Sequence, residues 1–410
     1  MATNMEDLLK TQQKNRKASW RPKGFIQWLL IVLAGIALPV IIMMAYYIFY
    51  PSNLFNITSL LAFFALINPM FLLILTLIIL FLAVLAFWKK AKIAQTILIP
   101  LVFLLLFLNV YPITSMLSYS KSKNVSVSIG SHFAIKNDIS SIPMQDVVYG
   151  KTTNGIELKL DVWLAKQETE GALTPAIVKV HGGGWVEGDK NNNPYWNQWL
   201  NELGYTVFDV QYRMPPQAGW KDEVGDVKSV LGWVLENADT YKIDTRKINV
   251  MGDSAGGNLV MLAAYSMGNV ALPPSTDVPD VPINAVINLY GPADMTQFYS
   301  NNPSPNYVQR VMEQYIGGSP SQFPDRYKML SPIYYIREGT PPTITFLGTS
   351  DRIVPEEQAA ILDKEMAENG VAHELYLLPA SDHVFDEKPG SLSTQFAREK
   401  VKRFLQKYNK

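Results

Sequence analysis

The sequence predicts two structural classes in one chain. An all-α transmembrane unit of about three helices comes first, and an α/β domain with a mostly parallel central sheet flanked by helices follows it. Two observations support this division. Residues 25–88 contain no charged side chain, and neither do residues 93–120. From about Asp146 onward, short apolar runs rich in β-branched residues alternate with amphipathic helical patterns, which indicates βαβ units.

The composition excludes several classes of function. The 36 acidic and 36 basic residues give a formal net charge of zero, so nothing favours a nucleic-acid or polyanionic partner. Cysteine is absent, which excludes disulfides, thiolate metal sites and cysteine nucleophiles. The apolar segments 25–88 and 93–120 contain no Asp, Glu, Lys, Arg or His, which argues against an ion or proton pathway and favours a membrane anchor.

Residues 25–120 form the predicted membrane region. A bilayer core about 30 Å thick requires roughly 20 apolar helical residues, and three segments satisfy this, at about 25–50, 59–88 and 92–112. The stretch Ile57–Leu66 is also apolar, but Asn68-Pro69 separates it from the second span. This stretch could lengthen the second helix, lie in the interface or begin a re-entrant turn. We expect three spans, with four as the alternative.

The distribution of basic residues predicts the orientation. The N-terminal segment 1–24 carries six lysines and arginines between Lys10 and Lys23, and the loop after the second span carries three between Lys89 and Lys92. The loop 51–56 carries none. The positive-inside rule therefore places the N-terminus in the cytoplasm. Three crossings of the plasma membrane would make the following domain extracytoplasmic, and four would reverse its side.

A linker over 121–145 leads to the α/β domain, residues 146–410. Its predicted strands are Ala176–Val180, Tyr205–Tyr212, Ile248–Met251, Ala285–Leu289, Thr343–Leu347 and Leu375–Leu378. Its amphipathic helices are Asp222–Ala238, Pro355–Asn369 and Ser391–Gln406. The segment 292–335, rich in Asn, Pro, Ser and aromatic residues, is longer than a crossover requires. We expect an insertion that forms a lid, or a decorated crossover without a role in substrate choice.

The nucleophile is predicted from the run Gly252-Asp253-Ser254-Ala255-Gly256. This G-x-S-x-G pattern follows a strand and precedes a helix, which is the context of a nucleophile elbow. Glycines two residues to either side of the serine leave room for the tight turn. The N-terminus of the helix also directs backbone N–H groups at the reacting centre. We therefore expect Ser254 to be the nucleophile.

The general base and the acid are predicted from their places after later strands. The chain has four histidines, and His383 follows the last strand, at the carboxyl end of the sheet. Asp351 follows the strand Thr343–Leu347 and lies between nucleophile and base, which is the chain order of such triads. Asp382 adjoins the base, but sequence neighbours rarely orient each other's rings. We expect Ser254, Asp351 and His383 to be catalytic, without a metal or cofactor.

A second run, His181-Gly182-Gly183-Gly184-Trp185, directly follows the strand Ala176–Val180. Successive glycines let a backbone approach a ligand closely and present unobstructed N–H donors. Each such donor to an oxyanion contributes roughly 3–4 kcal/mol to the transition state. We expect His181 to orient this loop through a hydrogen bond and Asp253 to organise the elbow.

The runs HGGGW, GDSAGG, GTSDRIVP and SDHVF, in this order, resemble the hormone-sensitive-lipase-type branch of α/β-hydrolase esterases. The resemblance covers the chain from about Val147 to its C-terminus. It implies the triad already named and an oxyanion hole formed by the N–H groups of Gly183, Gly184 and Ala255. Trp185 after the glycines also resembles aryl-formamidase and feruloyl-esterase relatives.

These features predict a membrane-anchored serine hydrolase that cleaves lipid or small acyl esters through an acyl-enzyme. The expected partners are an ester substrate and the membrane. The alternatives are a cell-envelope polysaccharide deacetylase, a membrane acyltransferase, a peptidase, and an inert hydrolase-like binding domain. The last usually lacks the nucleophile or the base, whereas this sequence has a candidate for each.

Overall fold

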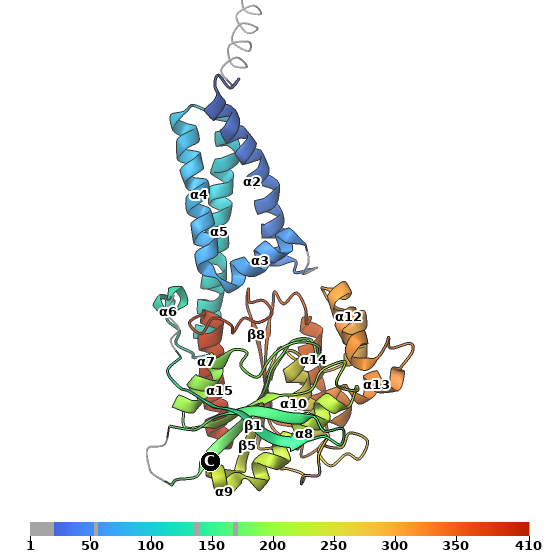
Figure 1. Cartoon of the computed structure of the whole chain (residues 1–410). Coiled ribbons are helices and arrows are strands. Elements are labelled where there is room, and N and C mark those ends of the chain that lie inside the picture. Colours follow the sequence, from blue (N-terminus) through green and yellow to red (C-terminus); the bar gives the residue numbers. More distant parts are fainter. Residues whose placement is uncertain (1–19, 53–55, 135–138, 167–170, 410) are drawn as a thin grey trace, which may run out of the picture. The chain divides into compact units, whose positions relative to one another are not determined.

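The computed structural model describes residues 20–409 except 53–55, 135–138 and 167–170 (Figure 1). Four of the basic residues used to predict the orientation, from Lys10 to Lys17, lie outside the described residues. The chain separates into two compact units. The first comprises residues up to 50 together with 55–115, and the second comprises residues 51–54 together with 116–410.

The first unit is helical. Its helices are α2 (Phe25–Phe49), α3 (Ile57–Ile67), α4 (Pro69–Trp88) and the first part of α5 (Lys92–Ser122). Among the described residues, α2, α4 and α5 are long and apolar enough to cross a membrane. The 11 residues of α3 span only about 16 Å at 1.5 Å per residue, so α3 is too short to be a fourth span.

The expected second span, 59–88, is divided into α3 and α4 at Asn68. The Asn68 side chain accepts a hydrogen bond from the Met70 N–H at 3.1 Å, and Pro69 occupies the first helical position. Both features begin a new helix. Helix α5 continues to Ser122, well past the predicted end of the third span at 112 and into the expected linker.

The helices of the first unit pack through apolar side chains and leave others exposed. Ala34, Leu72, Ile79 and Leu98 belong to the buried core of this unit. In contrast, Phe81, Phe87 and Phe103 each expose about two thirds of their surface. Apolar side chains exposed around the helices are expected where lipid is the solvent.

The second unit contains, within the described residues, one eight-stranded sheet in the order β1-β2-β4-β3-β5-β6-β7-β8. The β1/β2 and β2/β4 pairs are antiparallel and the remaining pairs are parallel. This confirms the predicted α/β-hydrolase class. The strands are β1 (Met144–Lys151), β2 (Glu157–Trp163), β3 (Thr174–Val180), β4 (Thr206–Gln211), β5 (Ile243–Asp253), β6 (Ala285–Leu289), β7 (Thr343–Gly348) and β8 (His373–Leu378).

Strands β1 and β2 were not among the predicted strands. Most residues of β1 are exposed or half-buried, as expected for an edge strand, so β1 lacks the continuous apolar run that marks β3 and β6. Strand β5 also begins at Ile243, before the predicted Ile248.

Two helical layers cover the sheet. Helices α8 (Asp222–Glu236), α9 (Ala238–Tyr241), α10 (Ala255–Tyr265) and α14 (Glu356–Glu368) contact its strands, as do α7 (Pro194–Glu202) and α15 (Leu392–Tyr408). Helices α8 and α10 contact each other, and Arg398 of α15 lies over the rings of Trp196 and Trp199 of α7. Because the central strands are buried on both faces, the layers cover opposite faces.

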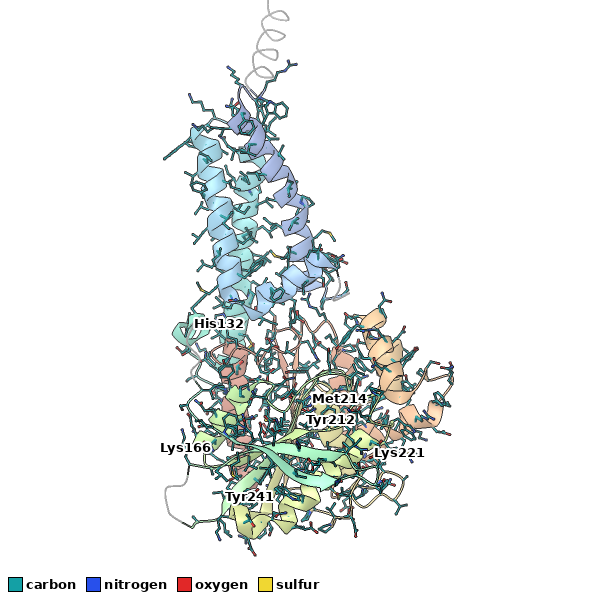
Figure 2. The ribbon with its side chains drawn as sticks, in the orientation of Figure 1. His132, Lys166, Tyr212, Met214, Lys221 and Tyr241 are labelled. Atoms are coloured by element: carbon teal, nitrogen blue, oxygen red, sulfur yellow. The ribbon has the colours of Figure 1, made fainter. Side chains whose placement is uncertain are left out.

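Two further segments complete the unit. The insertion 292–335 folds into α11 (Met295–Ser300), α12 (Pro305–Ile316), α13 (Pro324–Met329) and the 3-10 turn η1 (Pro332–Tyr335). In the expected linker, the short helix α6 (Ile129–Phe133) carries His132, which Figure 2 labels. The Leu392 N–H donates to His132 Nδ1 at 3.4 Å, so α6 docks at the start of α15.

Candidate active site

Ser254 lies in a sharp turn between β5 and α10. Its backbone has φ 51° and ψ −117°, a strained conformation for a residue with a side chain. A Cβ atom at Gly252 would lie 2.2 Å from the Gly256 carbonyl oxygen, and one at Gly256 would lie 2.1 Å from the Val180 carbonyl oxygen. The turn can therefore form only with glycine at both positions, and it projects the Ser254 hydroxyl out of the sheet.

The structure brings Ser254, His383 and Asp351 together. His383 Nε2 lies 3.0 Å from Ser254 Oγ, and His383 Nδ1 lies 2.8 Å from Asp351 Oδ2. The other carboxylate oxygen of Asp351 accepts the N–H groups of Ile353 and Val354, each at 2.8 Å. The acid is thereby fixed by its own loop, and the imidazole bridges acid and hydroxyl in the arrangement required of a general base.

The neighbouring carboxylates raise the pKa of His383. Burial alone would lower the pKa of His383, but the charge of Asp351, its hydrogen bond, and the charges of Asp382 and Asp253 outweigh burial and raise the pKa above 6.5. The raised pKa means that these carboxylates stabilise the imidazolium form of His383, as a general base at this position requires.

The glycine run lies against the elbow. The Gly182 N–H donates to Asp253 Oδ2 at 3.0 Å, and the N–H groups of Val186 and Glu187 bond the Gly183 carbonyl. Gly183 and Gly184 have φ of 116° and 58°. The bond from Gly182 to Asp253 ties this loop to the turn that carries Ser254, directly before Ala255 at the start of α10.

His181 and Asp253 hold this loop. His181 Nδ1 donates to the Gly182 carbonyl at 2.6 Å, and its ring stacks on Tyr212 at 4.3 Å between centroids. Burial lowers the pKa of His181 to about 4, so its ring is neutral. Burial, followed by the charge of Asp386, raises the pKa of Asp253 to about 7. Both residues orient the backbone as the sequence suggested.

A buried ion pair links the loop after β7, which carries Asp351, to the loop after β8, which carries His383. Arg352 Nε donates to Asp382 Oδ2 at 2.6 Å, and Asp382 Oδ1 accepts the N–H groups of Arg352 at 3.2 Å and His383 at 2.7 Å. Arg352 is 0% exposed and Asp382 2%. Asp382 is therefore not the acid that orients the His383 ring. Instead, it bonds both Arg352, the neighbour of Asp351, and the backbone of His383. The sequence offered only the adjacency of Asp382 to the base.

Tyr290 and Asp386 form a second support that the sequence reasoning missed. The Tyr290 ring lies 4.7 Å from the His383 ring, and its hydroxyl donates to Asp386 Oδ1 at 2.5 Å. Asp386 Oδ2 accepts the Trp196 indole N–H at 2.7 Å. Burial and then the charge of Asp386 raise the pKa of Tyr290, which keeps its phenol a donor. The only feature of the sequence that could have indicated this support is the position of Asp386, three residues after His383.

Helix α12 of the insertion covers the glycine loop. A Cβ atom at Gly184 would lie 3.1 Å from Tyr307 Oη and 3.3 Å from Val311 Cγ2. Ser304, directly before α12, donates to the Arg352 carbonyl at 2.7 Å. The insertion therefore contacts both the glycine loop and the acid loop, which places it over the site.

The known proteins that resemble this chain match its α/β unit. A sequence profile of the BD-FAE family matches residues 160–366. Esterase LipQ of Mycobacterium tuberculosis is 29% identical over 263 residues, which cover 63% of this chain and 61% of LipQ. The probable carboxylic ester hydrolase LipM of the same organism is 28% identical, covering 59% of this chain and 56% of LipM. The chain thus spans about three fifths of the length of these curated relatives.

Solved esterase structures share the fold. A truncated carbohydrate esterase from gut microbiota superposes with a TM-score of 0.57 at 25% identity, covering 67% of this chain and 99% of that one. The propionate-bound esterase Est2 of Thermogutta terrifontis superposes with a TM-score of 0.54 at 26% identity, covering 65% of this chain and 94% of its own. With half of its length matched by the family profile and this fold in place, the chain belongs to the BD-FAE family of α/β-hydrolase esterases.

Proposed function

We propose that this protein is a membrane-anchored serine hydrolase that cleaves carboxylic esters through an acyl-enzyme. The observation that carries the proposal is the chain of contacts from Asp351 through His383 to Ser254, at 2.8 and 3.0 Å. Esterase names and esterase structures among the relatives support the same activity.

The proposed mechanism follows from these contacts. His383 Nε2 takes the hydroxyl proton as Ser254 Oγ attacks the ester carbonyl carbon, and Asp351 stabilises the imidazolium that results. The N–H groups of Gly183, Gly184 and Ala255 receive the negative charge on the carbonyl oxygen. The alcohol leaves with the proton from His383, and an acyl-enzyme remains. Water then attacks the acyl carbon with His383 again as base, which releases the acid and restores Ser254.

Labelling with a fluorophosphonate probe tests the nucleophile in the full chain in membranes. We expect wild type to be labelled and Ser254→Ala to remain unlabelled. Ser321→Ala, which changes an exposed hydroxyl on the insertion, serves as the matched control and should label like wild type. Equal labelling of wild type and Ser254→Ala would mean that another serine is the nucleophile.

We further propose that α2, α4 and α5 cross the plasma membrane, with the N-terminus in the cytoplasm and the α/β unit outside. Three candidate spans and the short length of α3 support an odd number of crossings. The basic residues near Lys89, between the second and third spans, support this orientation.

The absence of cysteine allows a clean test of orientation. A single Ser321→Cys variant should react with a membrane-impermeant maleimide on intact cells. A Lys90→Cys variant, in the loop between α4 and α5, should react only after permeabilisation. The opposite pattern would reverse the orientation, and equal access of both sites in intact cells would contradict membrane insertion.

Deacylation of a carbohydrate is the second candidate function. Its specific support is the structural match to nearly the whole of a carbohydrate esterase. The same triad would serve, so the two candidates differ in the alcohol that leaves and not in the chemical steps.

A further inference from the structure

The loop that carries the base is bonded on both flanks of His383 to the first turn of α15. On one side, the hydroxyl of Ser381 shares a hydrogen bond of 2.6 Å with the hydroxyl of Ser393. On the other side, the Phe385 carbonyl accepts the Thr394 hydroxyl at 3.3 Å. Ser393 and Thr394 are both buried. The position of His383 therefore depends on the position of this turn.

Helix α6 is joined to the same turn by Gln395. The side-chain oxygen of Gln395 accepts the Ser128 N–H at 2.7 Å, and its side-chain nitrogen donates to the Ser128 carbonyl at 3.0 Å. The same nitrogen donates to the Gly390 carbonyl at 2.7 Å. Ser128 also caps α6, because its hydroxyl accepts the Ser131 N–H at 3.2 Å. One glutamine therefore links the start of α6 to the start of α15 and to the loop before it.

The backbone of α6 packs directly against Gly390. A Cβ atom at Gly390 would lie 2.2 Å from the Ser131 carbonyl oxygen, so no side chain fits between the two backbones. His132, the next residue of α6, is buried, and its Nδ1 accepts the Leu392 N–H at 3.4 Å. The first N–H groups of a helix have no partner within that helix. His132 therefore supplies an acceptor for the N–H group that begins α15.

The stretch before α6 packs on α15 as well. The last residues of α5, 116–122, belong to the second unit. The rings of Tyr119 and Phe396 lie 5.3 Å apart, and Lys400 Nζ donates to the Lys123 carbonyl at 3.1 Å. The chain that leads from α5 through α6 is therefore packed along α15 and is not a free tether.

We propose that α6 positions the catalytic base, because it holds the first turn of α15 and this turn fixes both flanks of His383 between Asp351 and Ser254. Residues of α6 act through α15 and not on the substrate, so they are positioning residues. The inference rests on the proposed hydrolysis at Ser254. It makes the stretch 116–133, which follows the apolar helices, a requirement for catalysis and not only for attachment.

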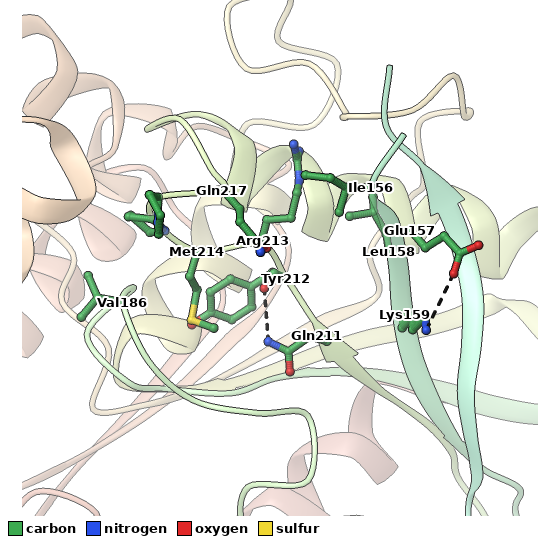
Figure 3. Close-up of a pocket in the computed structure, with 12 residues that line it drawn as sticks. Ile156, Glu157, Leu158, Lys159, Val186, Gln211, Tyr212, Arg213, Met214 and Gln217 are labelled. Atoms are coloured by element: carbon green, nitrogen blue, oxygen red, sulfur yellow. Dashed lines mark hydrogen bonds and ion pairs between the residues drawn. The ribbon is translucent and has the colours of Figure 1, made fainter. Parts of the chain in front are cut away.

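These contacts are separate from the cavity beyond the end of β4. That cavity has a volume of about 330 Å³, and its lining includes Tyr212 and Met214 (Figure 3). Among the described residues, its lining includes none from α6, from α15 or from the loop 384–391. In the strand order, β4 and β8 also lie on opposite sides of β5. Loss of the α6 contacts should therefore move the base, leave the walls of this cavity in place, and lower kcat without raising KM.

Gly390→Ala in the full chain in membranes tests this role with one methyl group. The new Cβ would overlap the Ser131 carbonyl oxygen, so α6 and the loop must separate, and a misplacement of about 1 Å at a reacting group can cost about 100-fold in rate. We expect kcat for 4-nitrophenyl acetate to fall at least about tenfold, with KM within about twofold of wild type. Gly130→Ala is the matched control, because its Cβ on α6 would meet only Ser128 Oγ, at 3.6 Å. It should retain the wild-type kcat.

A second pair of variants introduces no clash and decides the question if Gly390→Ala fails to fold. His132→Leu removes the acceptor of the Leu392 N–H. His132→Asn restores an acceptor, because the side-chain oxygen of asparagine can take the same bond. We expect His132→Leu to lower kcat about fivefold, since it loosens α6 without displacing it. His132→Asn should recover most of this loss.

Fluorophosphonate labelling distinguishes positioning from loss of folded protein. The extent of labelling at completion counts the folded active sites, while the rate of labelling reports how well His383 activates Ser254. We expect Gly390→Ala and His132→Leu to reach the wild-type extent at a lower rate.

The pH dependence of the labelling rate gives a second readout. Burial alone would lower the pKa of His383, and the charge and hydrogen bond of Asp351, with the charges of Asp382 and Asp253, raise it. An imidazole that has moved away from Asp351 loses part of this rise. Because the base acts in its neutral form, the midpoint of the rate against pH should move to lower pH in Gly390→Ala. A lower content of folded protein alone would not move this midpoint.

Labelling rates of Gly390→Ala and His132→Leu equal to that of wild type would overturn the proposal, and would mean that the bonds of Asp386 to Tyr290 and Trp196 fix the loop without α6. A lower extent of labelling with an unchanged rate and an unchanged pH midpoint would also overturn it, because α6 would then support folding alone. Either result, with normal labelling of wild type, refutes only the role of α6. Absence of labelling in wild type would instead refute the proposed serine hydrolysis itself.

Discussion

The ion pair between Arg352 and Asp382 gives the sharpest test of how the triad is held. Both side chains are fully buried, and Asp382 also bonds the backbone N–H of His383. Arg352→Met would leave the Asp382 carboxyl buried without its cation. Breaking a buried pair in this way costs about 3–5 kcal/mol of folding free energy. Asp382→Asn alone should also destabilise, because it leaves the Arg352 guanidinium without its counter-charge.

The double variant Arg352→Met/Asp382→Asn should recover most of this loss. It buries no unpaired charge at the pair, and the side-chain oxygen of the introduced asparagine can still accept the two backbone N–H groups that Asp382 Oδ1 accepts at 3.2 and 2.7 Å. If the double variant costs no more than about 2 kcal/mol, while each single variant costs about 3–5 kcal/mol, the coupling free energy between the two changes is at least about 4 kcal/mol. In thermal terms, each single variant should lower Tm by roughly 6–20 °C, at about 2–4 °C per kcal/mol for a domain of this size class.

The assay is thermal unfolding of the full chain in detergent, with fluorophosphonate labelling as the report on the active site. A matched control is the surface pair of Arg246, 82% exposed on its side chain, with Asp244 at 3.0 Å. Arg246→Met should leave Tm nearly unchanged, because an exposed ion pair contributes little to stability. Additivity of the Arg352 and Asp382 changes within about 0.5 kcal/mol would refute the reasoning, because it would show that the two charges do not depend on each other.

Three further predictions concern single residues. Asp351→Asn should slow fluorophosphonate labelling about 10⁴-fold and move the remaining activity to lower pH, because burial, no longer opposed by the carboxylate, lowers the pKa of His383; an unshifted pH profile would contradict this role. Gly256→Ala should reduce labelling at least 100-fold, because its Cβ would lie 2.1 Å from the Val180 carbonyl oxygen and the elbow must move; near-normal labelling would show that the turn tolerates a side chain. Burial and then the charge of Lys388 lower the pKa of His132 from 6.5 to about 4. As the pH drops from 6.5 toward 4, the unfolded chain binds a proton at His132 before the folded chain does, so the free energy of unfolding should fall by up to about 3 kcal/mol. Denaturant titrations at several pH values should show that His132→Asn loses this part of the pH dependence.

The sequence determined the local features of this protein. The charge-free segments predict membrane helices because a bilayer tolerates few charges. The order of the glycine run, the elbow, Asp351 and His383 predicts the α/β-hydrolase fold, because the carboxyl ends of parallel strands meet at one edge of the sheet. Glycine at 252 is likewise a local requirement, since its Cβ would meet the Gly256 carbonyl within the same turn, whereas glycine at 256 avoids the Val180 carbonyl of the neighbouring strand β3.

Only the tertiary structure decided which distant side chains support these residues. The partner of Arg352 is 30 positions away along the chain, and Tyr290, directly after β6, reaches His383 in the loop after β8. The stacking of Tyr315 on Trp185 depends on where the insertion packs. No spacing rule describes such contacts, because they depend on how whole elements pack and not on the turn or period of one segment. Local sequence patterns therefore identified the candidate triad. Packing of the helices and strands determined which distant side chains support the triad and surround it.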